Sequence, residues 1–445
     1  MRELAERVIA EASRRGATAA ECVIRYGREL SVSVRMDEVE SIKQAEGKAL
    51  GIRVFKGQQA GVTHSSDLAW PAVSAMLDAA LAIAEASSPD PAAGLPRPQD
   101  LGQLAADLQL YDPTVLEVSA DQALDLARRA ERAALACDPR LTNCNGASFD
   151  AGEGTKILAN SLGFLGEVRR SSCSLSVAPI AEHKGAKQRD YWYTVSRGPS
   201  GLEAPEQVGR IAAERTLRRL GARRAATGRY PVVFEPQTAR TLLGHIFDAA
   251  SGESIYREAS FLTGALGREV AAPLFTLVDD GSLPGALGSS PFDAEGVPTR
   301  RTVIVGDGRL QSYLLNTYAA RKLSLATTGN AARGLAAAPG VSCGNLTLLP
   351  GASTPEDIIA AVPQGLYVTE LIGFGVNTVT GDYSRGASGL WIENGQLAYP
   401  VEEITIAGNL KDILRNITAI GNDLEIRGAV NAPTLRVDGL TVAGR

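Results

Sequence analysis

The first part of the chain alternates apolar and polar residues with a period of two, which is typical of strands that bury one face. The alternation is clearest in Leu30-Ser-Val-Ser-Val34. Glycine and charged residues interrupt it at Gly27-Arg28, Glu46-Gly47 and Lys56-Gly57, where we expect turns. The expected strands are 22–26, 30–36, 39–44, 49–55 and 60–63. This segment therefore predicts several short strands that share one buried face.

Helical periodicity follows strand-like sequence twice in this half of the chain. The expected helices are 68–86, 119–137 and 205–221. Pro71 suits the first turn of the first helix, and Ser119 or Asp121 would cap the second. The proline-rich stretch 87–100 predicts an irregular connector, because proline cannot continue a helix. Strand-like sequence returns over 141–195, before the third helix.

These patterns predict an α+β protein of two domains, since 445 residues exceed what one core usually organises. Strands followed by a helix, twice over, suggest a pseudo-repeated N-terminal α+β domain over 1–225. The remainder, 226–445, is predicted to be β-rich with a curved or barrel-like sheet. Its short strands carry glycine turns, and Asn394-Gly395 is a strong hairpin signal. Helices are expected here over 236–250 and 354–361.

The charge balance gives little reason to expect a nucleic-acid partner. Lysine and arginine number 45 against 50 acidic residues, a formal net charge of -5, so binding to phosphates would need a local patch. The helix at 205–221 carries the most obvious patch, with Arg210, Arg215, Arg218 and Arg219. We interpret it as a solvated face near a domain boundary rather than as a docking site.

No segment predicts secretion or a membrane span. Residues 1–16 resemble an amphipathic helix rather than a signal peptide, and Asp78 and Glu85 interrupt the alanine-rich stretch 69–86. The five cysteines have no C-x-x-C spacing, which suits reduced thiols. We therefore expect a cytoplasmic protein.

Familiar catalytic motifs are missing from the sequence. His64, His183 and His245 lie far apart, and none has a second histidine at the spacing of a zinc helix. A metal site assembled from distant donors stays open. No nucleophile elbow or phosphate-binding loop is found. The pairs Asp279-Asp280 and Glu402-Glu403 are interpreted as turn or surface charges.

The stretch Asp382-Tyr-Ser-Arg385 mixes both charges with an aromatic and a hydroxyl, just before the hairpin at Asn394-Gly395. Such a composition is typical of binding loops carried by a rigid scaffold. The alternative is a plain surface turn that needs its flanking glycines, Gly381 and Gly386.

Several longer segments together resemble the TldD/PmbA family, and specifically its TldE (PmbA) subunit type. The most recognisable is Thr380-Gly-Asp-Tyr-Ser-Arg-Gly-Ala-Ser-Gly389. The other matching segments are 244–257, 290–297, 318–323, 368–371, 403–412 and 421–423. Their order and spacing cover most of 230–425, whereas the N-terminal half contributes fewer diagnostic residues.

The resemblance implies a partnership with a TldD-type protease subunit, which carries the zinc helix of the family. At the matching positions this chain has Gly244, His245 and Ala249, and two of these have no donor side chain. The region after Asn422-Asp423, where the protease subunit supplies a cysteine ligand, contains no Cys or His up to Pro433. We therefore expect no catalytic residues, metal or cofactor in this chain, with zinc in the partner.

The resemblance thus implies a non-catalytic subunit that completes a chamber for unfolded peptides, for proteolysis or for maturation of peptide precursors. Asp382, Tyr383, Ser384 and Arg385 are our candidates for substrate or partner contact. One alternative is a homodimeric peptide-binding or regulatory protein, resembling a DNA gyrase modulator, without protease activity. An independent metalloprotease with another site is the third.

Overall fold

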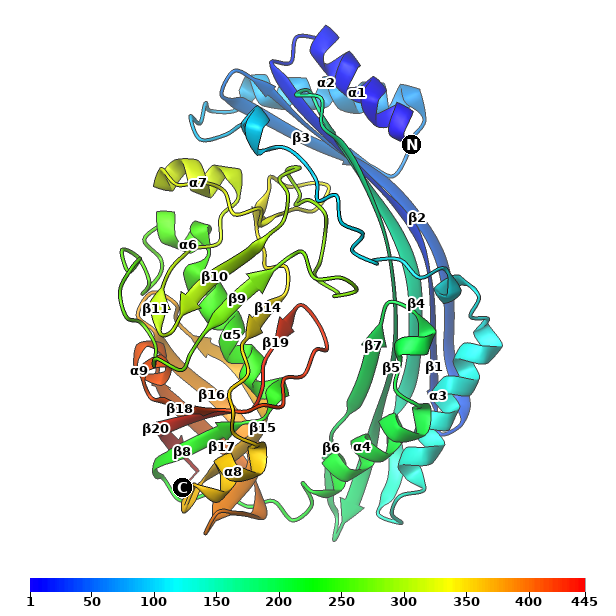
Figure 1. Cartoon of the computed structure of the whole chain (residues 1–445). Coiled ribbons are helices and arrows are strands. Elements are labelled where there is room, and N and C mark those ends of the chain that lie inside the picture. The colour runs from blue at the N-terminus through cyan, green and yellow to red at the C-terminus, as the bar shows by residue number, and fades with distance from the viewer. Residues whose placement is uncertain (445) are drawn as a thin grey trace.

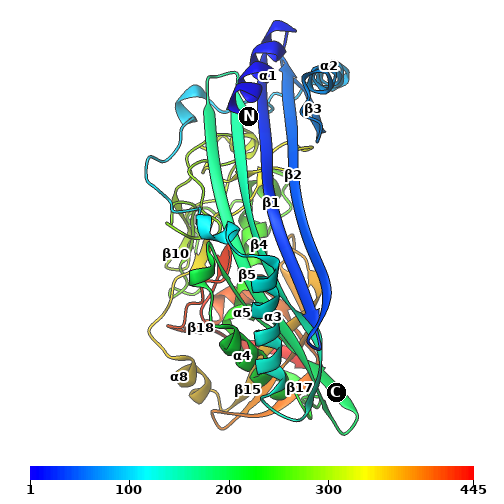
Figure 2. The same cartoon turned by 90° about the vertical axis from the view of Figure 1, so that its right-hand side faces the viewer.

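A computed structural model describes residues 1–444 and shows one large, curved sheet facing a second unit rich in β-strands (Figure 1). The large sheet is antiparallel with the order β3-β2-β1-β4-β5-β6, and β7 also pairs with β5. Its strands are β1 Ala19–Arg35, β2 Glu38–Lys56, β3 Gln59–Ser65, β4 Leu141–Asn160, β5 Leu165–His183, β6 Ala186–Arg189 and β7 Trp192–Ser196. The four longest run side by side along most of the molecule (Figure 2).

Two of the three turns expected near the start of the chain are wrong. β1 and β2 run without a break through Gly27-Arg28 and Glu46-Gly47, and Gly27 pairs directly with Gly47. Here glycine serves close strand contact, because a Cβ on Gly27 would lie 2.2 Å from the carbonyl oxygen of Glu153. The turn at Lys56-Gly57 is confirmed between β2 and β3.

Helices cover the face of the large sheet that points away from the second unit (Figures 1 and 2). They are α1 Arg2–Arg14, α2 Trp70–Ala86, α3 Ala120–Leu135 and α4 Pro205–Leu217. Alternate residues of β1 supply this core: Cys22 and Ile24 pack under α1 and α2, and Val32 and Val34 under α3 and α4. The residue between the first two, Val23, packs on the other face, against Phe292 of the second unit.

The three helices expected in this half are confirmed. α2 has Pro71 in its first turn, and α3 begins with a capping box in which Ser119 and Gln122 exchange hydrogen bonds, so Ser119 rather than Asp121 is the cap. None of the helices within 1–444 is long and apolar enough to cross a membrane.

The second unit contains a closed five-stranded barrel, β17-β16-β15-β8-β20, in which β17 also pairs with β20. The barrel strands and the adjoining β18 are β8 Gly228–Phe234, β15 Gln364–Val376, β16 Asp382–Glu393, β17 Gln396–Asn409, β20 Leu435–Ala443 and β18 Ile417–Ile420. The expected barrel-like sheet is therefore confirmed. Asn394 and Gly395 both have positive φ at the β16–β17 turn, which confirms the predicted hairpin.

A second sheet, β11-β10-β9-β14-β19, completes this unit. Its strands are β9 Leu277–Asp280, β10 Arg301–Gly306, β11 Arg309–Leu310, β14 Leu346–Leu348 and β19 Val430–Asn431, and a small pair is β12 Ala331–Ala332 with β13 Gly340–Val341. The helices are α5 Pro236–Ala250, α6 Gly252–Tyr256, α7 Thr317–Leu323, α8 Pro355–Ala360 and α9 Leu410–Arg415. α5, predicted over the same residues, contacts strands of both the barrel and the second sheet.

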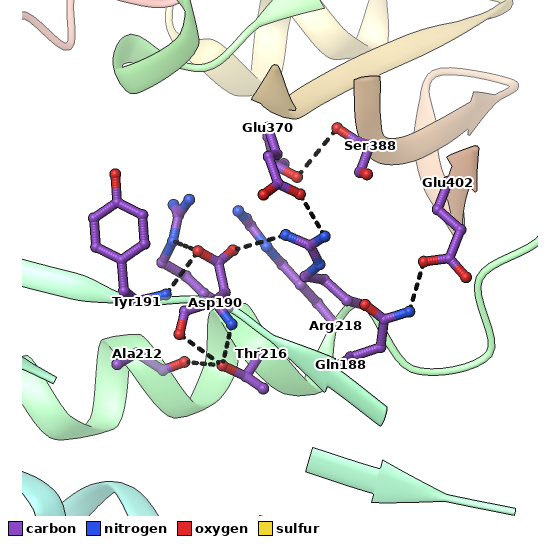
Figure 3. Close-up of polar contacts among 12 residues, drawn as sticks. Gln188, Asp190, Tyr191, Ala212, Thr216, Arg218, Glu370, Ser388 and Glu402 are labelled. Atoms are coloured by element: carbon purple, nitrogen blue, oxygen red, sulfur yellow. Dashed lines mark hydrogen bonds and ion pairs between the residues drawn. The ribbon is translucent and has the colours of Figure 1, made fainter. Parts of the chain in front are cut away.

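Ion pairs tie α4 to the second unit, so its basic cluster is not the solvated face that the sequence predicts. Arg215 is 8% exposed and donates to Glu235 at 2.7 Å, and Arg218 donates to the same carboxylate at 3.0 Å. Arg219 donates to Glu370 of β15 at 2.5 Å. Figure 3 shows how Glu370 reaches down to this cluster across the interface. The arginines therefore fix the position of the two units relative to each other.

The proline-rich connector, residues 87–100, contacts α7 of the second unit, far from the α4 ion pairs (Figure 1). It contains no α-helix or strand, and a short 3-10 turn, Pro98–Asp100, ends it. The carboxylate of Asp90 accepts a 2.7 Å hydrogen bond from Tyr318 of α7, and Arg321 of α7 donates to carbonyl oxygens of the connector. The connector is thus fastened along α7 rather than free.

Candidate functional site

Helix α5 carries the positions where the resemblance places the metal helix of the partner. It starts after Glu235 with Pro236 in its first turn, where the missing N–H costs nothing. Ala249 is fully buried in the core, and Gly244 faces open space, since a Cβ there would meet no atom within 4 Å. Only His245 presents a donor atom.

The imidazole of His245 is engaged by β16. Its Nε2 lies 3.3 Å from Nη1 of Arg385, and its ring meets Tyr383 edge to face with ring centroids 6.2 Å apart. Burial, and then the charge of Arg385, lower the pKa of His245. The neutral ring therefore accepts a hydrogen bond from the guanidinium.

A zinc ion does not fit these residues. The remaining histidine already faces a fixed cation, and the two companion positions have no ligand atom. Within residues 1–444, no three side chains of His, Cys, Asp or Glu converge so as to hold a metal ion. A catalytic zinc needs three protein ligands, so we derive no metal-dependent step in this chain.

The four contact candidates belong to the start of β16 and not to a loop. Because a strand alternates its faces, Asp382 and Ser384 point outward and are exposed, whereas Tyr383 and Arg385 turn toward α5. Only this second pair meets His245. Asp382 instead accepts hydrogen bonds from Thr380, in the preceding turn, and from Asn409, at the end of β17. These two hydrogen bonds, that of Thr380 first, lower the pKa of Asp382.

Tyr383 is unusual because it is 1% exposed and its hydroxyl has no hydrogen-bond partner within residues 1–444. Burial raises its pKa. A buried hydroxyl without a partner costs stability, so the residue is not explained by packing alone.

A groove of about 450 Å³ runs beside His245, between α5, α6 and the end of β15. Acidic residues line part of it, and burial raises the pKa of one of them, Asp248. Phe374 stands at its edge with its side chain 99% exposed, and Ile372 is 55% exposed nearby. The segment 372–379 carries three exposed apolar side chains, Ile372, Phe374 and Val379, and is called the apolar tip below; its Phe374 lines the His245 groove.

A larger cavity of about 950 Å³ lies between the large sheet and the second unit. One wall is formed by β1, β2, β4 and β5, and the other by segments around β9, β12 and β13. Its lining is rich in charge. Asp279 of β9, interpreted from sequence as a turn or surface charge, is 2% exposed on the second wall. Burial raises its pKa to about 6.

Sequence reasoning missed this cavity because its lining comes from four strands and from distant loops. One signal was available: Gly27 and Gly47 stand within strand-like sequence. Glycine inside a strand often marks a close approach of backbone or ligand. Interpreting both as turns concealed it.

Comparisons with known proteins give a consistent picture. Models of PmbA/TldA metallopeptidase domain 1, central domain and C-terminal domain match residues 20–84, 113–220 and 227–444. The metalloprotease PmbA of Escherichia coli O157:H7 is 42% identical over 426 residues, which cover 96% of this chain and 92% of that protein.

Solved structures agree with this similarity. A Bacteroides thetaiotaomicron protein, described as a candidate modulator of DNA gyrase, is 28% identical with a TM-score of 0.92, over 100% of this chain and 98% of that chain. TldE from Thermococcus kodakarensis shares the fold with a TM-score of 0.89 at 20% identity, over 99% of this chain and 100% of that chain.

Proposed function

The chain belongs to the PmbA/TldD metallopeptidase family, as a PmbA/TldE-type member, and from this premise we propose that it is the non-catalytic subunit of a cytoplasmic two-subunit metalloprotease. A TldD-type partner would hold the zinc ion and cut the peptide. The observation that carries this proposal is found in α5: two of the three ligand positions lack a donor atom, and the third, His245, is in contact with the guanidinium of Arg385.

In this proposal the chain contributes the 950 Å³ cavity as part of a chamber that admits unfolded peptides. An extended peptide fits the space between two walls better than a folded domain does. The apolar tip, with its exposed Ile372, Phe374 and Val379, would contact the partner, because exposed apolar side chains grouped on one segment favour an interaction site. Tyr383 and Arg385, just behind this tip, would support that contact.

Reconstitution tests the proposal. The purified chain is mixed with its TldD-type partner and assayed on an unstructured peptide, with and without a zinc chelator. We expect cleavage only by the mixture, and loss of cleavage after chelation. Chelator-sensitive cleavage by this chain alone, or zinc bound to it at one ion per chain, would contradict the proposal.

A regulatory homodimer is the second candidate, favoured by the name given to the Bacteroides relative. The same exposed apolar tip would then join two copies of this chain. Light scattering separates the two candidates: a stable homodimer that does not exchange subunits with the partner would favour the second.

A further inference from the structure

Three neighbouring strands bring three cations together on the cavity wall. Arg25 of β1 pairs directly with Lys156 of β4, and Gly154, two residues before Lys156, pairs with Arg170 of β5. Residues two apart in a strand share a face, so the three side chains emerge from the same face of the sheet as close neighbours. All three line the 950 Å³ cavity.

These cations have no carboxylate partner among residues 1–444. The guanidinium of Arg25 donates to the carbonyl oxygen of Arg333 at 2.6 Å. The ammonium of Lys156 has one long hydrogen bond of 3.5 Å to the carbonyl oxygen of Asp293 and lies 4.9 Å from the centre of the Phe292 ring. Nε of Arg170 is buried without a hydrogen-bond partner. Burying a charge without an ion-pair partner lowers the stability of a protein. If no ligand bound here, replacing one of these cations by an apolar residue would therefore increase the free energy of unfolding.

Nearby carboxylates are committed elsewhere. Asp293 accepts backbone N–H groups from Glu295 and Val297 on one oxygen and from Ala331 on the other. Glu153 is paired with arginines at the sheet surface. Asp293 is close enough to Lys156 for their charges to attract. Among residues 1–444, however, no carboxylate forms an ion pair with any of the three cations, so one nearby carboxylate faces three positive charges.

A row of glycines crosses the large sheet beside the three cations. Gly47, Gly27 and Gly154 form a continuous row across β2, β1 and β4, in register with Arg170. Gly47 and Gly154 leave space above the backbone, since a Cβ would meet no atom within 4 Å at Gly47 and only the Tyr26 carbonyl oxygen, at 3.9 Å, at Gly154. At Gly27 this space is taken by the backbone of β4. A small group could approach the sheet closely at Gly47 and Gly154 and reach all three cations.

We propose that Arg25, Lys156 and Arg170 form a subsite for a carboxylate of a peptide held in the cavity, either its C-terminal carboxylate or that of an acidic side chain. Arginine recognises carboxylates through paired N–H donors, and lysine adds a point charge. Glu29, Glu46 and Asp279 also line the cavity, so side chains of both charges surround the three cations. The choice of a peptide as ligand rests on the proposed function.

Binding to the isolated chain tests the subsite. The probe is a fluorescein-labelled neutral peptide of Ser, Ala and Val in three forms: with a free C-terminal carboxylate, with a C-terminal amide, and with the amide and one internal Asp. We expect the free acid to bind and the plain amide to bind at least about tenfold more weakly. Binding of the Asp form assigns the site to side-chain carboxylates as well.

Variants locate the binding. Arg170→Gln and Lys156→Met should each weaken binding of the free acid about tenfold or more. Arg169→Gln is the matched control, since Arg169 is the adjacent cation on the opposite face and is paired with Glu153. Each variant is also unfolded in urea. If Lys156 had only a structural role, Lys156→Met would lower stability, whereas a ligand-binding role predicts weaker binding together with higher stability.

Equal binding of acid and amide, or equal effects of Arg169→Gln and Arg170→Gln, would overturn the subsite. Binding of inorganic phosphate without binding of any peptide would overturn it too. The test does not use the partner, so its failure leaves the reconstitution assay free to succeed, and a failed reconstitution leaves this result intact.

Discussion

Replacing Lys156 by Met should stabilise the isolated protein, because it removes a buried charge whose burial is not offset by an ion pair. Burial, and then the nearby charge of Arg170, lower the pKa of Lys156 to about 7 from an ordinary value of 10.5. The unfolded chain therefore holds a proton that the folded chain has lost between these two pH values. Stability of the wild type rises with pH across this window, and the full penalty applies below pH 7.

The size of the effect follows from the same shift. By linkage the penalty amounts to at most about 5 kcal/mol below the folded pKa, and it vanishes above the ordinary one. Lys156→Met should therefore raise the free energy of unfolding by several kcal/mol near neutral pH and by progressively less toward pH 10.5. Burial raises the pKa of Asp293 to about 6 and that of Glu295 to about 7, so both carboxyls titrate at or below the lower edge of this window.

The assay is urea unfolding at a series of pH values, in a low-salt buffer without phosphate, because a bound anion would mask the penalty. Lys187→Met is the control, since Lys187 is exposed on β6 and should change stability by no more than about 0.5 kcal/mol. A variant less stable than the wild type near pH 7, or a difference that does not depend on pH, would refute the reasoning.

Other substitutions test the framework around the cavity. Glu235→Ala leaves Arg215 of α4 and Arg218, just after it, without their shared buried partner and should cost about 3–5 kcal/mol in urea unfolding. Glu403→Ala, at an exposed ion pair, should cost less than about 1 kcal/mol. Gly27→Ala forces a methyl group against a β4 carbonyl and should prevent stable folding, whereas Gly47→Ala meets no atom within 4 Å and should express normally. Arg385→Ala should lower activity of the reconstituted pair about tenfold or more and raise the pKa of the α5 histidine toward its ordinary value in an NMR titration. Unchanged activity would return the β16 residues to a structural role.

Local signals were read well from the sequence where the chain itself supplies the partner. Ser119 finds its capping partner three residues later, and Asn394-Gly395 adopts the positive φ angles of its hairpin. Helix α5 was predicted to its ends because Pro236 starts it and its apolar face is regular. In each case the interactions that decide the structure lie within a few residues.

Positions whose role depends on distant segments were misjudged. Gly27 looks like a turn until a third strand, β4, is placed beside it. Arg215 looks like a surface charge until Glu235 of the other unit is seen at 2.7 Å. Composition along one segment cannot report which face of a strand meets which wall, so neither the ion pairs nor the cation cluster could be inferred from spacing.

The two units that form the walls of the cavity are joined by contacts on both sides of it. On one side the α4 arginines hold Glu235 and Glu370, and on the other the connector is hydrogen-bonded along α7. A site that must receive a flexible peptide gains affinity when the protein does not reorganise on binding. The buried charges of the wall add to this, because an anion that enters pairs with cations already in place. The three cations therefore lower the free energy of unfolding of the empty chain, and a bound peptide carboxylate offsets this by pairing with them. For this reason Lys156→Met should increase stability and weaken peptide binding together.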